Sequence, residues 1–467
     1  MQQYTGKRVT VMGIGLHGGA VETIQWFLKK GARVVATDLK RSSELAPSLE
    51  KLKGLKNLTI VTGIHRVEDF TQTDLIVKNP AVRWDNEYVQ LAFSKKIPVE
   101  MDASLFFQEC KSKKIIGITG TKGKTTTALL IYEILKKAGE KVVLVGVGQE
   151  GVMGKLKIID EKTWVVFELS SWRLSALKRK KVSPFGAVVV NLLQDHLNYY
   201  HNMAEYAQDK KAIFEFQKET DWLVIDGENF IEDLWLTKKS ALKQKIGYFS
   251  EKGNGLERNV YLKEGKISFF WEGKSGELGA IQNLRLRGKH NQKNVLAAVS
   301  AGLFLQVKPE VIWSAVSNFA GAPHRLELVR ELNGIKFYND TAATTPEAGI
   351  KGIQSFQEDI HLIAGGSNKN LNLEGFAREI AENPKVRKVY FLNGSATEGL
   401  KNLVGKLGGE KKIAGIFESI EEAVAVCRKE VLPNDIVLLS PGCASFGMFQ
   451  NEFDRGEKFC QAVRKLG

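Results

Sequence analysis

The sequence predicts an α/β protein of three domains in series, and three observations support this prediction. The chain has 467 residues, which at roughly 150 residues per domain corresponds to about three domains. Apolar residues make up 43% of it, enough to fill several cores and to exclude wholesale disorder. Short apolar runs alternate with helical stretches, as in sheets of mostly parallel strands. We place the domains at residues 1–110, 111–321 and 322–467.

The first domain opens with the pattern of a dinucleotide-binding fold. A strand-like run at 8–12 leads into Gly13-Ile14-Gly15-Leu16-His17-Gly18, a helical stretch follows, and a second apolar run ends at Asp38. Strand, glycine turn, helix, strand and an acid about 20 residues on form the first unit of a Rossmann-like sheet. Further strands are expected at 58–61, 75–77 and 97–100. The glycine pattern alone suggests NAD, but it is a weak motif by itself.

The second domain carries the strongest single motif of the chain. A buried-type strand at 115–119 runs directly into Gly120-Thr121-Lys122-Gly123-Lys124-Thr125-Thr126, and a helical stretch at 128–137 follows. Backbone N–H groups at such a turn, together with the helix N-terminus, form a cradle for anions. Lys124 is placed to reach the outer phosphates of a nucleotide, and the Thr125 hydroxyl to bind Mg²⁺. The motif lacks the first glycine of the full Walker spacing, yet it predicts a P-loop-type ATP-binding parallel sheet.

Polar side chains follow the neighbouring strands of this second sheet. Glu168 comes directly after the strand expected at 163–167, and Asp195-His196 follow the strand at 187–190 after a short loop. A carboxylate and an imidazole at adjacent strand ends can hold Mg²⁺ beside the phosphate loop. The rest of the domain is expected to contain a strand at 222–225, helices at about 204–216 and 291–305, and a β-rich segment at 245–285.

The third domain repeats the α/β alternation and is predicted to be Rossmann-like. Its strands are expected at 335–338, 360–363, 388–392 and 436–439. Three of them run into loops of small or polar residues, namely Asn339-Asp340-Thr341, Ala364-Gly365-Gly366 and Ser440-Pro441-Gly442. Because ligands bind at the carboxyl ends of parallel strands, these loops are candidates for a second part of the site.

Taken in order, these motifs resemble those of the Mur ligases, the ATP-dependent amide-forming enzymes of peptidoglycan precursor synthesis. The resemblance covers essentially the whole chain, and within the family it is greatest to the MurD branch, which adds D-glutamate to UDP-N-acetylmuramoyl-L-alanine. The matching segments are Gly120–Thr126, Glu168–Ser171, Asn191 with Asp195-His196, Gly288–Asn291 with Asn294, Pro323–Arg325 with Glu327, Asn339–Thr341, Gly365-Gly366 with Lys369, Ser440–Ser445 and Arg455-Gly456.

The resemblance implies a reaction in which ATP phosphorylates the substrate carboxylate and an incoming amine displaces phosphate from the acyl phosphate. It implies catalytic roles for Lys124, His196, Lys210 and Arg325. The residues implied in ATP binding are Gly120, Thr121, Lys122, Gly123, Lys124, Thr125, Thr126, Asn291, Asn294, Arg325 and Asp340. Two Mg²⁺ ions are implied, with Thr125, Glu168, His196 and Lys210 as ligands. Family spacing selects Lys210 rather than the adjacent Lys211 as the lysine that carries a carbamate, and a solvated lysine pair is the alternative.

The resemblance also implies two substrate sites. The UDP-sugar is expected at Gly15, Leu16, His17, Asp38 and Ser170, and the amino acid at Thr344, Lys369, Ser445 and Phe446. The sequence departs from the family pattern at three places. Ala342 stands where some relatives carry Lys, Arg173 stands where Gln is usual, and the loop at 147–151 lacks the usual Asn.

Composition narrows the remaining classes of function. The formal charge is +14, but the lysines are spread along the chain and no stretch interleaves basic with aromatic residues, so nucleic-acid binding is the minor hypothesis. The sequence contains no uninterrupted apolar run of about 18 residues or more, so we expect no membrane span. The N-terminus lacks the features of a signal peptide, and four cysteines without CxxC spacing do not form a disulfide framework. We therefore expect a cytoplasmic, monomeric enzyme. The alternative within the same chemistry is another muramoyl ligase or a folylpolyglutamate-type synthase.

Overall fold

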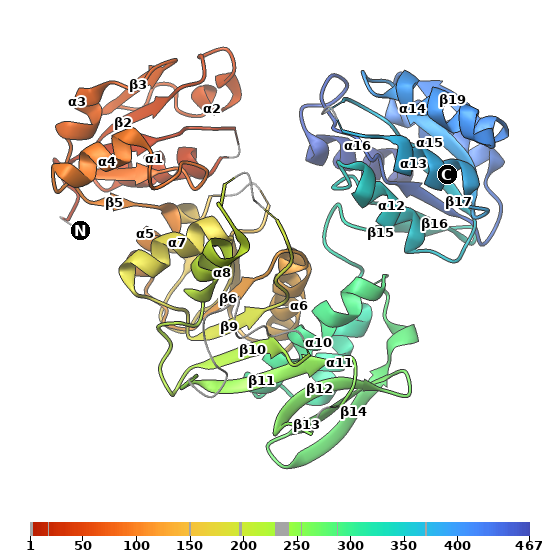
Figure 1. The fold of residues 1–467 in the computed structure, drawn as a ribbon, viewed down its shortest axis with the longest axis horizontal. Helices are drawn as coiled ribbons and strands as arrows, with labels where there is room; N and C mark the ends of the chain where they lie inside the picture. The colour runs from red at the N-terminus through yellow and green to blue at the C-terminus, as the bar shows by residue number, and fades with distance from the viewer. Residues whose placement is uncertain are drawn as a thin grey trace. The chain divides into compact units, whose positions relative to one another are not determined.

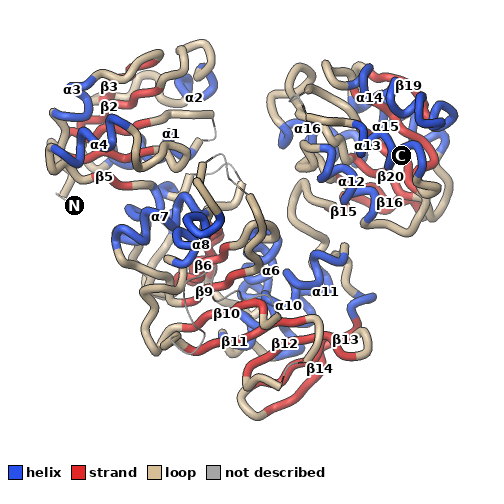
Figure 2. The backbone as a smooth tube through the Cα atoms, in the orientation of Figure 1, coloured by secondary structure: helices blue, strands red, loops and turns tan. Residues whose placement is uncertain are grey.

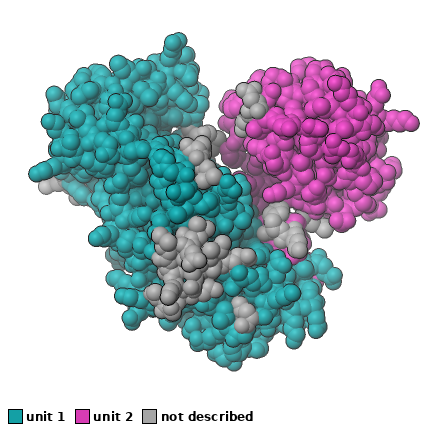
Figure 3. Space-filling view, in the orientation of Figure 1, with its two compact units in different colours: residues 1–282, 293–316 teal, residues 283–292, 317–467 magenta. Residues whose placement is uncertain are grey.

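The computed structural model describes residues 3–16, 18–148, 151–195, 199–228, 242–253, 255–286, 288–368 and 371–467. Three sheets succeed one another along the chain, each flanked by helices (Figure 1). The chain divides into two compact units: residues 1–282 with 293–316, and residues 283–292 with 317–467 (Figure 3). The predicted three-part α/β architecture is confirmed, while the domain limits at 110 and 321 stay predictions. Among the described residues, no helix is long and apolar enough to cross a membrane.

The first sheet is entirely parallel, with the strand order β3-β2-β1-β4-β5. Its strands are β1 (Arg8–Met12), β2 (Arg33–Asp38), β3 (Leu58–Thr62), β4 (Leu75–Lys78) and β5 (Val99–Glu100). The helices that follow them are α1 (Gly19–Lys29), α2 (Ala46–Glu50), α3 (Val67–Thr71), α4 (Glu87–Ser94) and α5 (Asp102–Glu109). The chain leaves β1 on one side and returns through β4 on the other. The glycine loop after β1 therefore lies beside the end of β4, at the position where such sheets bind ligands.

The second sheet places the phosphate loop between two strand ends. Its strands are β6 (Ile115–Thr119), β7 (Val142–Val145), β8 (Trp164–Glu168), β9 (Gly186–Val189), β10 (Trp222–Asp226), β11 (Lys245–Ser250), β12 (Arg258–Lys263), β13 (Lys266–Trp271) and β14 (Lys274–Ala280). The order is β14-β13-β12-β11-β10-β9-β6-β8-β7. Because β6 pairs in parallel with both β8 and β9, the segments that leave these three strands meet at one edge.

The structure adds detail to the β-rich segment expected at 245–285 and corrects the length of one helix. In that segment, β13 pairs antiparallel with both β12 and β14. The turns between them are Glu264-Gly265 and Glu272-Gly273, all four residues with positive φ, and turns of this kind close tight hairpins. The helix expected at 204–216 is α8 (Met203–Lys211) and ends five residues earlier. Beyond it the backbone continues in tighter turns, in which Ile213 N–H bonds the Lys210 carbonyl and Phe214 N–H bonds that of Lys211.

Further helices of this part flank the sheet, as Figure 2 shows. They are α6 (Lys124–Lys137), α7 (Ser171–Lys180), α10 (Lys289–Phe304) and α11 (Pro309–Asn318). A short 3₁₀ helix (Met153–Ile158) lies against α1 and α5. The Gly123 turn and Lys124 mark the start of α6, so the helix N-terminus points at the phosphate loop.

The third sheet has the strand order β15-β16-β20-β17-β18-β19. Among the described residues of this sheet, β15 is the one strand that pairs antiparallel. Its strands are β15 (Glu327–Leu332), β16 (Ile335–Asn339), β17 (Ile360–Ala364), β18 (Val386–Leu392), β19 (Ile413–Phe417) and β20 (Ile436–Leu439). Its helices are α12 (Pro346–Gln354), α13 (Glu374–Glu382), α14 (Thr397–Val404), α15 (Ile420–Glu430) and α16 (Glu452–Arg464). Leu362 and Leu438 pack into the core on one face, while Ile363 and Leu439 pack on the other, so both faces are buried.

Candidate active site

The phosphate loop is a backbone turn that wraps around its own lysine. Gly123 has a φ of +84° and forms the N-cap of α6. A side chain there would also collide with the Oδ1 atom of the buried Asn294, so the position requires glycine. The Lys124 Nζ atom donates to the carbonyl oxygens of Gly120 and Thr121, both at 3.1 Å. The ammonium group therefore lies over the turn, where phosphate oxygens would be neutralised.

Asn191, which follows β9, fixes the shape of this turn. Its Oδ1 atom accepts the N–H groups of Thr121 and Lys122, both at 3.0 Å, and its Nδ2 atom donates to the Lys122 carbonyl at 2.9 Å. One amide side chain thus satisfies three backbone groups of the turn. The sequence identified Asn191 as a motif residue but assigned it no role.

The ends of the adjacent strands bring oxygen atoms to the loop. The Thr125 Oγ1 atom donates to Glu168 Oε2 at 2.8 Å, and the Lys122 Nζ atom lies 3.2 Å from Asp195 Oδ2. A hydroxyl and a carboxylate this close are oxygen ligands of the type that Mg²⁺ prefers. His196, the predicted imidazole ligand, lies outside the described residues. Within the described ranges, no three His, Cys, Asp or Glu side chains converge on one point.

Lys210 contacts the phosphate loop from α8. It is 1% exposed, and its Nζ atom donates to the Gly120 carbonyl at 2.9 Å and to Thr119 Oγ1 at 3.3 Å. Burial, with the nearby Lys124, lowers the pKa of Lys210 well below its usual value. The adjacent Lys211 is directed elsewhere and forms an ion pair with Glu215 at 3.3 Å. Family spacing favoured Lys210 over Lys211, and in the structure Lys210 is the one that lies beside the loop.

The other predicted ATP contacts are divided between the two units. Asn294, 2% exposed, packs against Gly123. Asn291, Arg325 and Asp340 belong to the second unit. There the Asp340 carboxylate accepts Ser440 Oγ at 2.8 Å and the Leu326 N–H at 3.2 Å, and burial raises the pKa of Asp340 to about 7. These bonds hold the loop that carries Arg325, whose side chain is exposed.

A buried arginine joins the two loops predicted to bind the amino acid. Arg455, on α16, donates from Nε to Thr341 Oγ1 at 2.9 Å, from Nη2 to the Thr341 carbonyl at 3.0 Å and from Nη1 to the Cys443 carbonyl at 3.2 Å. It is 0% exposed, and desolvation lowers its pKa to about 10. Arg455 belongs to a matching motif, but no role was predicted for it. Of the predicted contacts, Thr344 is half-buried, Ser445 is buried and Phe446 is exposed, while Lys369 lies outside the described residues.

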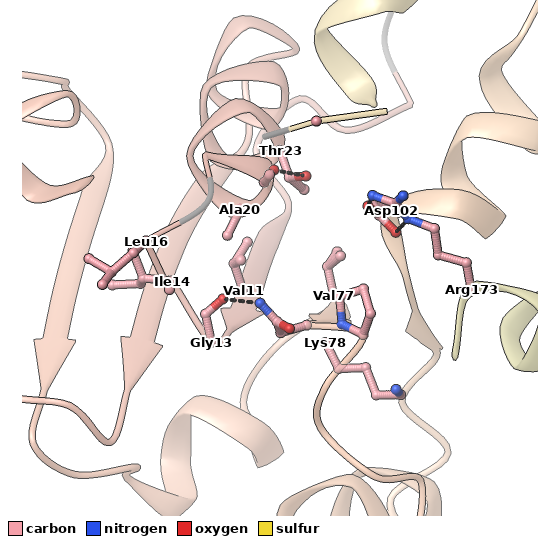
Figure 4. Close-up of a pocket in the computed structure, with 15 residues that line it drawn as sticks. Val11, Gly13, Ile14, Leu16, Ala20, Thr23, Val77, Lys78, Asp102 and Arg173 are labelled. Atoms are coloured by element: carbon pink, nitrogen blue, oxygen red, sulfur yellow. Dashed lines mark hydrogen bonds and ion pairs between the residues drawn. The ribbon is translucent and has the colours of Figure 1, made fainter. Parts of the chain in front are cut away.

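A pocket of about 190 Å³ lies at the carboxyl edge of the first sheet (Figure 4). The glycine loop, α1 and the segment after β4 line it on one side, and Asp102, Gly148 and Arg173 complete the wall. Gly15 and Leu16 are among its lining residues, as predicted for the UDP-sugar site.

Two other predicted UDP-sugar residues have internal partners, and neither lines this pocket. Asp38 accepts the Gly15 N–H at 3.0 Å and so holds the glycine loop. Ser170 caps α7 by accepting the Arg173 N–H at 3.2 Å. His17 lies outside the described residues.

Arg173 and Asp102 form an ion pair in the pocket wall. The Arg173 Nη2 atom lies 2.8 Å from Asp102 Oδ2, and Nε lies 3.2 Å from the same atom (Figure 4). The residue that departs from the family pattern therefore has a partner within the protein. Asp102 was not predicted, because no local signal in the sequence marks it. Lys78 and Asn79 were not predicted either. Both are polar residues at the end of β4 and line this pocket, so their position after an apolar run is the signal that could have identified them.

Lys78 is buried at this pocket, and its ionisation should be visible in the stability of the protein. Its Nζ atom donates to the Val82 carbonyl at 2.7 Å and lies 4.2 Å from the Trp84 ring centre. Burial, and secondarily Arg179, lowers the pKa of Lys78 from 10.5 to about 7. The folded state loses the Lys78 proton at a lower pH than the unfolded state does. The free energy of unfolding therefore increases as pH rises from about 7 to 10.5.

We expect the free energy of unfolding of the wild type to rise, relative to Lys78→Met, as pH goes from about 7 towards 10.5. Urea denaturation of both proteins at several pH values measures this difference. Lys95→Met, at an exposed position after α4, is the control and should parallel the wild type. Parallel curves for wild type and Lys78→Met would show that Lys78 does not titrate in this range.

The fold and this geometry define a class of protein. A glycine-rich loop between the ends of parallel strands, beside a threonine–glutamate pair, is typical of nucleotide-binding proteins of the P-loop type.

Comparison with known proteins identifies the family. The model of the Mur ligase middle domain matches residues 118–302, that of the Mur ligase glutamate ligase domain residues 324–443, and that of the MurD-like N-terminal domain residues 7–100. UDP-N-acetylmuramoylalanine–D-glutamate ligase of Roseiflexus sp. (strain RS-1) is 37% identical over 99% of this chain and 100% of its own length. The enzyme of the same name from Borreliella afzelii is 36% identical over 98% and 97%. The chain belongs to the Mur ligase family.

Solved structures agree with this at the level of the fold. UDP-N-acetylmuramate-alanine ligase MurC from Thermotoga maritima superposes with a TM-score of 0.60 at 20% identity, covering 98% of this chain and 99% of its own. MurF ligase from the same organism, solved in complex with ADP, has a TM-score of 0.53 at 16% identity and covers 99% and 96%. The family models and the curated relatives confirm the family predicted from the motifs, whereas the roles of individual site residues stay predictions.

Proposed function

We propose that this protein joins D-glutamate to UDP-N-acetylmuramoyl-L-alanine at the expense of ATP, a cytoplasmic step of peptidoglycan precursor synthesis. The observation that carries the proposal is the phosphate loop beside the Thr125–Glu168 pair, in a chain whose full-length relatives bear the name of this ligase. The chemistry requires phosphorylation of the alanyl carboxylate to an acyl phosphate, which the amine of D-glutamate then attacks.

The residues at the loop fit the first half of this reaction. Lys124 and the N-terminus of α6 offset the charge of the β- and γ-phosphates. Thr125, Glu168, His196 and a carbamate on Lys210 would hold two Mg²⁺ ions, which neutralise the charge of the transferring phosphoryl group when bound. The low pKa of Lys210 supports the carbamate, because only a neutral amine reacts with CO₂.

The remaining predicted residues are assigned to ATP and to the amino acid. We assign Arg325 to the γ-phosphate, since a guanidinium binds phosphoryl oxygens through two parallel hydrogen bonds. Asn291, Asn294 and Asp340 are assigned to the adenosine. Thr344, Lys369, Ser445 and Phe446 are assigned to D-glutamate, whose two carboxylates need cationic and hydroxyl partners. We propose further that the enzyme acts as a monomer.

Phosphate release by the purified protein tests the function. With ATP, Mg²⁺ and UDP-N-acetylmuramoyl-L-alanine, we expect phosphate release with D-glutamate and not with L-glutamate, D-alanine or L-lysine. The mass of the ligated product should equal that of the UDP-sugar plus D-glutamate less one water. Release with a different amino acid would move the acceptor assignment, with Ala342 the first position to examine. Release without the UDP-sugar, for example with folates, would refute the proposal.

A further inference from the structure

Glu22, in the first turn of α1, makes an unusual contact with a distant segment of the same unit. Its carboxylate accepts two backbone N–H groups, Oε1 from Gly151 at 2.9 Å and Oε2 from Gly154 at 3.1 Å. Both oxygens of one half-buried carboxylate are thus committed to a segment about 130 residues away, which follows β7.

The glycines at both positions are required for this contact. A Cβ atom on Gly151 would lie 2.7 Å from the Cβ of Glu22, and one on Gly154 would overlap the Oε2 atom. Gly154 lies in the first turn of the 3₁₀ helix at 153–158, where backbone N–H groups have no partner within the helix. Glu22 therefore supplies an acceptor that the segment itself lacks.

The contact adjoins the pocket on both of its sides. Gly19, Ala20 and Thr23, in the same turns of α1 as Glu22, line the pocket, and so does Gly148, three residues before Gly151. The carboxylate thus links α1, which lines one wall of the pocket, to a segment that begins three residues after Gly148 of another wall.

We infer that Glu22 is a positioning residue for the nucleotide-sugar pocket: it does not touch the substrate but holds the segment at 151–154 so that Gly148 completes the wall. The inference rests on the proposed function, because it takes the UDP-sugar as the ligand of this pocket. It assigns a positioning role to a side chain that no motif marks.

Binding of UDP-N-acetylmuramoyl-L-alanine, measured by calorimetry, tests the inference together with steady-state kinetics. Glu22→Gln keeps the size of the side chain but turns an amide towards one N–H, and Glu22→Ala removes both acceptors. We expect both to raise the Kd and the KM for the UDP-sugar about 10-fold or more, as for the loss of hydrogen bonds to a charged group. The KM for ATP and the kcat at saturating UDP-sugar should change less than about 2-fold.

Two further variants separate positioning from a general loss of structure. Gly154→Ala pushes the carboxylate away from the other side and should reproduce the weaker UDP-sugar binding. Combined with Glu22→Ala it should add little, since both changes break the same contact. Glu50→Gln, on the exposed face of α2, is the matched control and should bind as the wild type does.

The outcomes distinguish this inference from the proposed function. Unchanged UDP-sugar affinity in Glu22→Ala and Gly154→Ala, or an equal rise in the KM for ATP, would overturn the role of Glu22 while leaving the ligase intact. A wild-type protein that binds no UDP-sugar would overturn the proposed function and, with it, the ligand assumed here.

Discussion

Replacing Lys210 by alanine should reduce the rate of ligation at least about 100-fold, the scale on which loss of one group that stabilises a transition state acts. Lys210 is buried against the phosphate loop, with its amine 2.9 Å from the Gly120 carbonyl. Without it, the proposed metal site would lose the carbamate ligand. The rate of phosphate release at saturating substrates measures the effect. Acetate or formate should restore part of the activity, because each can place a carboxylate in the vacated space.

Lys211→Ala is the matched control, since it alters the next residue of the same helix. Lys211 pairs with Glu215 on a partly exposed face, and such a pair contributes about 0.3–0.5 kcal/mol. Lys211→Ala should therefore retain nearly full activity. Full activity in Lys210→Ala would remove Lys210 from the metal site. A ¹³C carbamate signal from protein in ¹³C-bicarbonate, lost in Lys210→Ala, would test the modification directly.

Gly123→Ala should abolish measurable ATP binding while leaving most of the fold intact. The backbone there has a φ of +84°, which costs about 1–2 kcal/mol for a residue with a Cβ. In addition, the new methyl group would collide with the buried Asn294, so either the phosphate loop or the start of α10 must move. Nucleotide titration by calorimetry and thermal unfolding together measure the two effects.

The other end of the same helix provides the control for strain. Gly139 has a φ of +81°, but a Cβ atom there meets nothing within 4 Å. Gly139→Ala should therefore lose a similar free energy of unfolding, about 1–2 kcal/mol, and still bind ATP. Equal ATP affinity in the two variants would show that the collision with Asn294 has no functional consequence.

Much of the site was predictable because its signals are local. The apolar run at 115–119, the glycines after it and the helical stretch that follows are contiguous in the chain, and local sterics make them a strand, a turn and a helix N-terminus. The same applies to Glu168, the last residue of β8, and to Asn339–Thr341, which begins at the last residue of β16. Parallel pairing then places these strand ends at a common edge.

Other features depend on where distant segments meet, which no local pattern records. Arg173 pairs with Asp102 across 71 residues, and Asn191 binds a turn about 70 residues earlier. The sequence predicted a β-rich segment at 245–285 but not the directions of its strands, which the structure gives as antiparallel hairpins from β12 to β14.

The sequence by itself determined the α/β class, the phosphate loop and the membership of the chain in its family, since each is written in contiguous residues. The tertiary structure decided which lysine of a pair reaches the loop, because adjacent residues on a helix point about 100° apart and packing alone fixes which direction is inward. It also decided the contact of Glu22 with Gly151 and Gly154, which exists because two glycines let one backbone approach a carboxylate from another part of the chain.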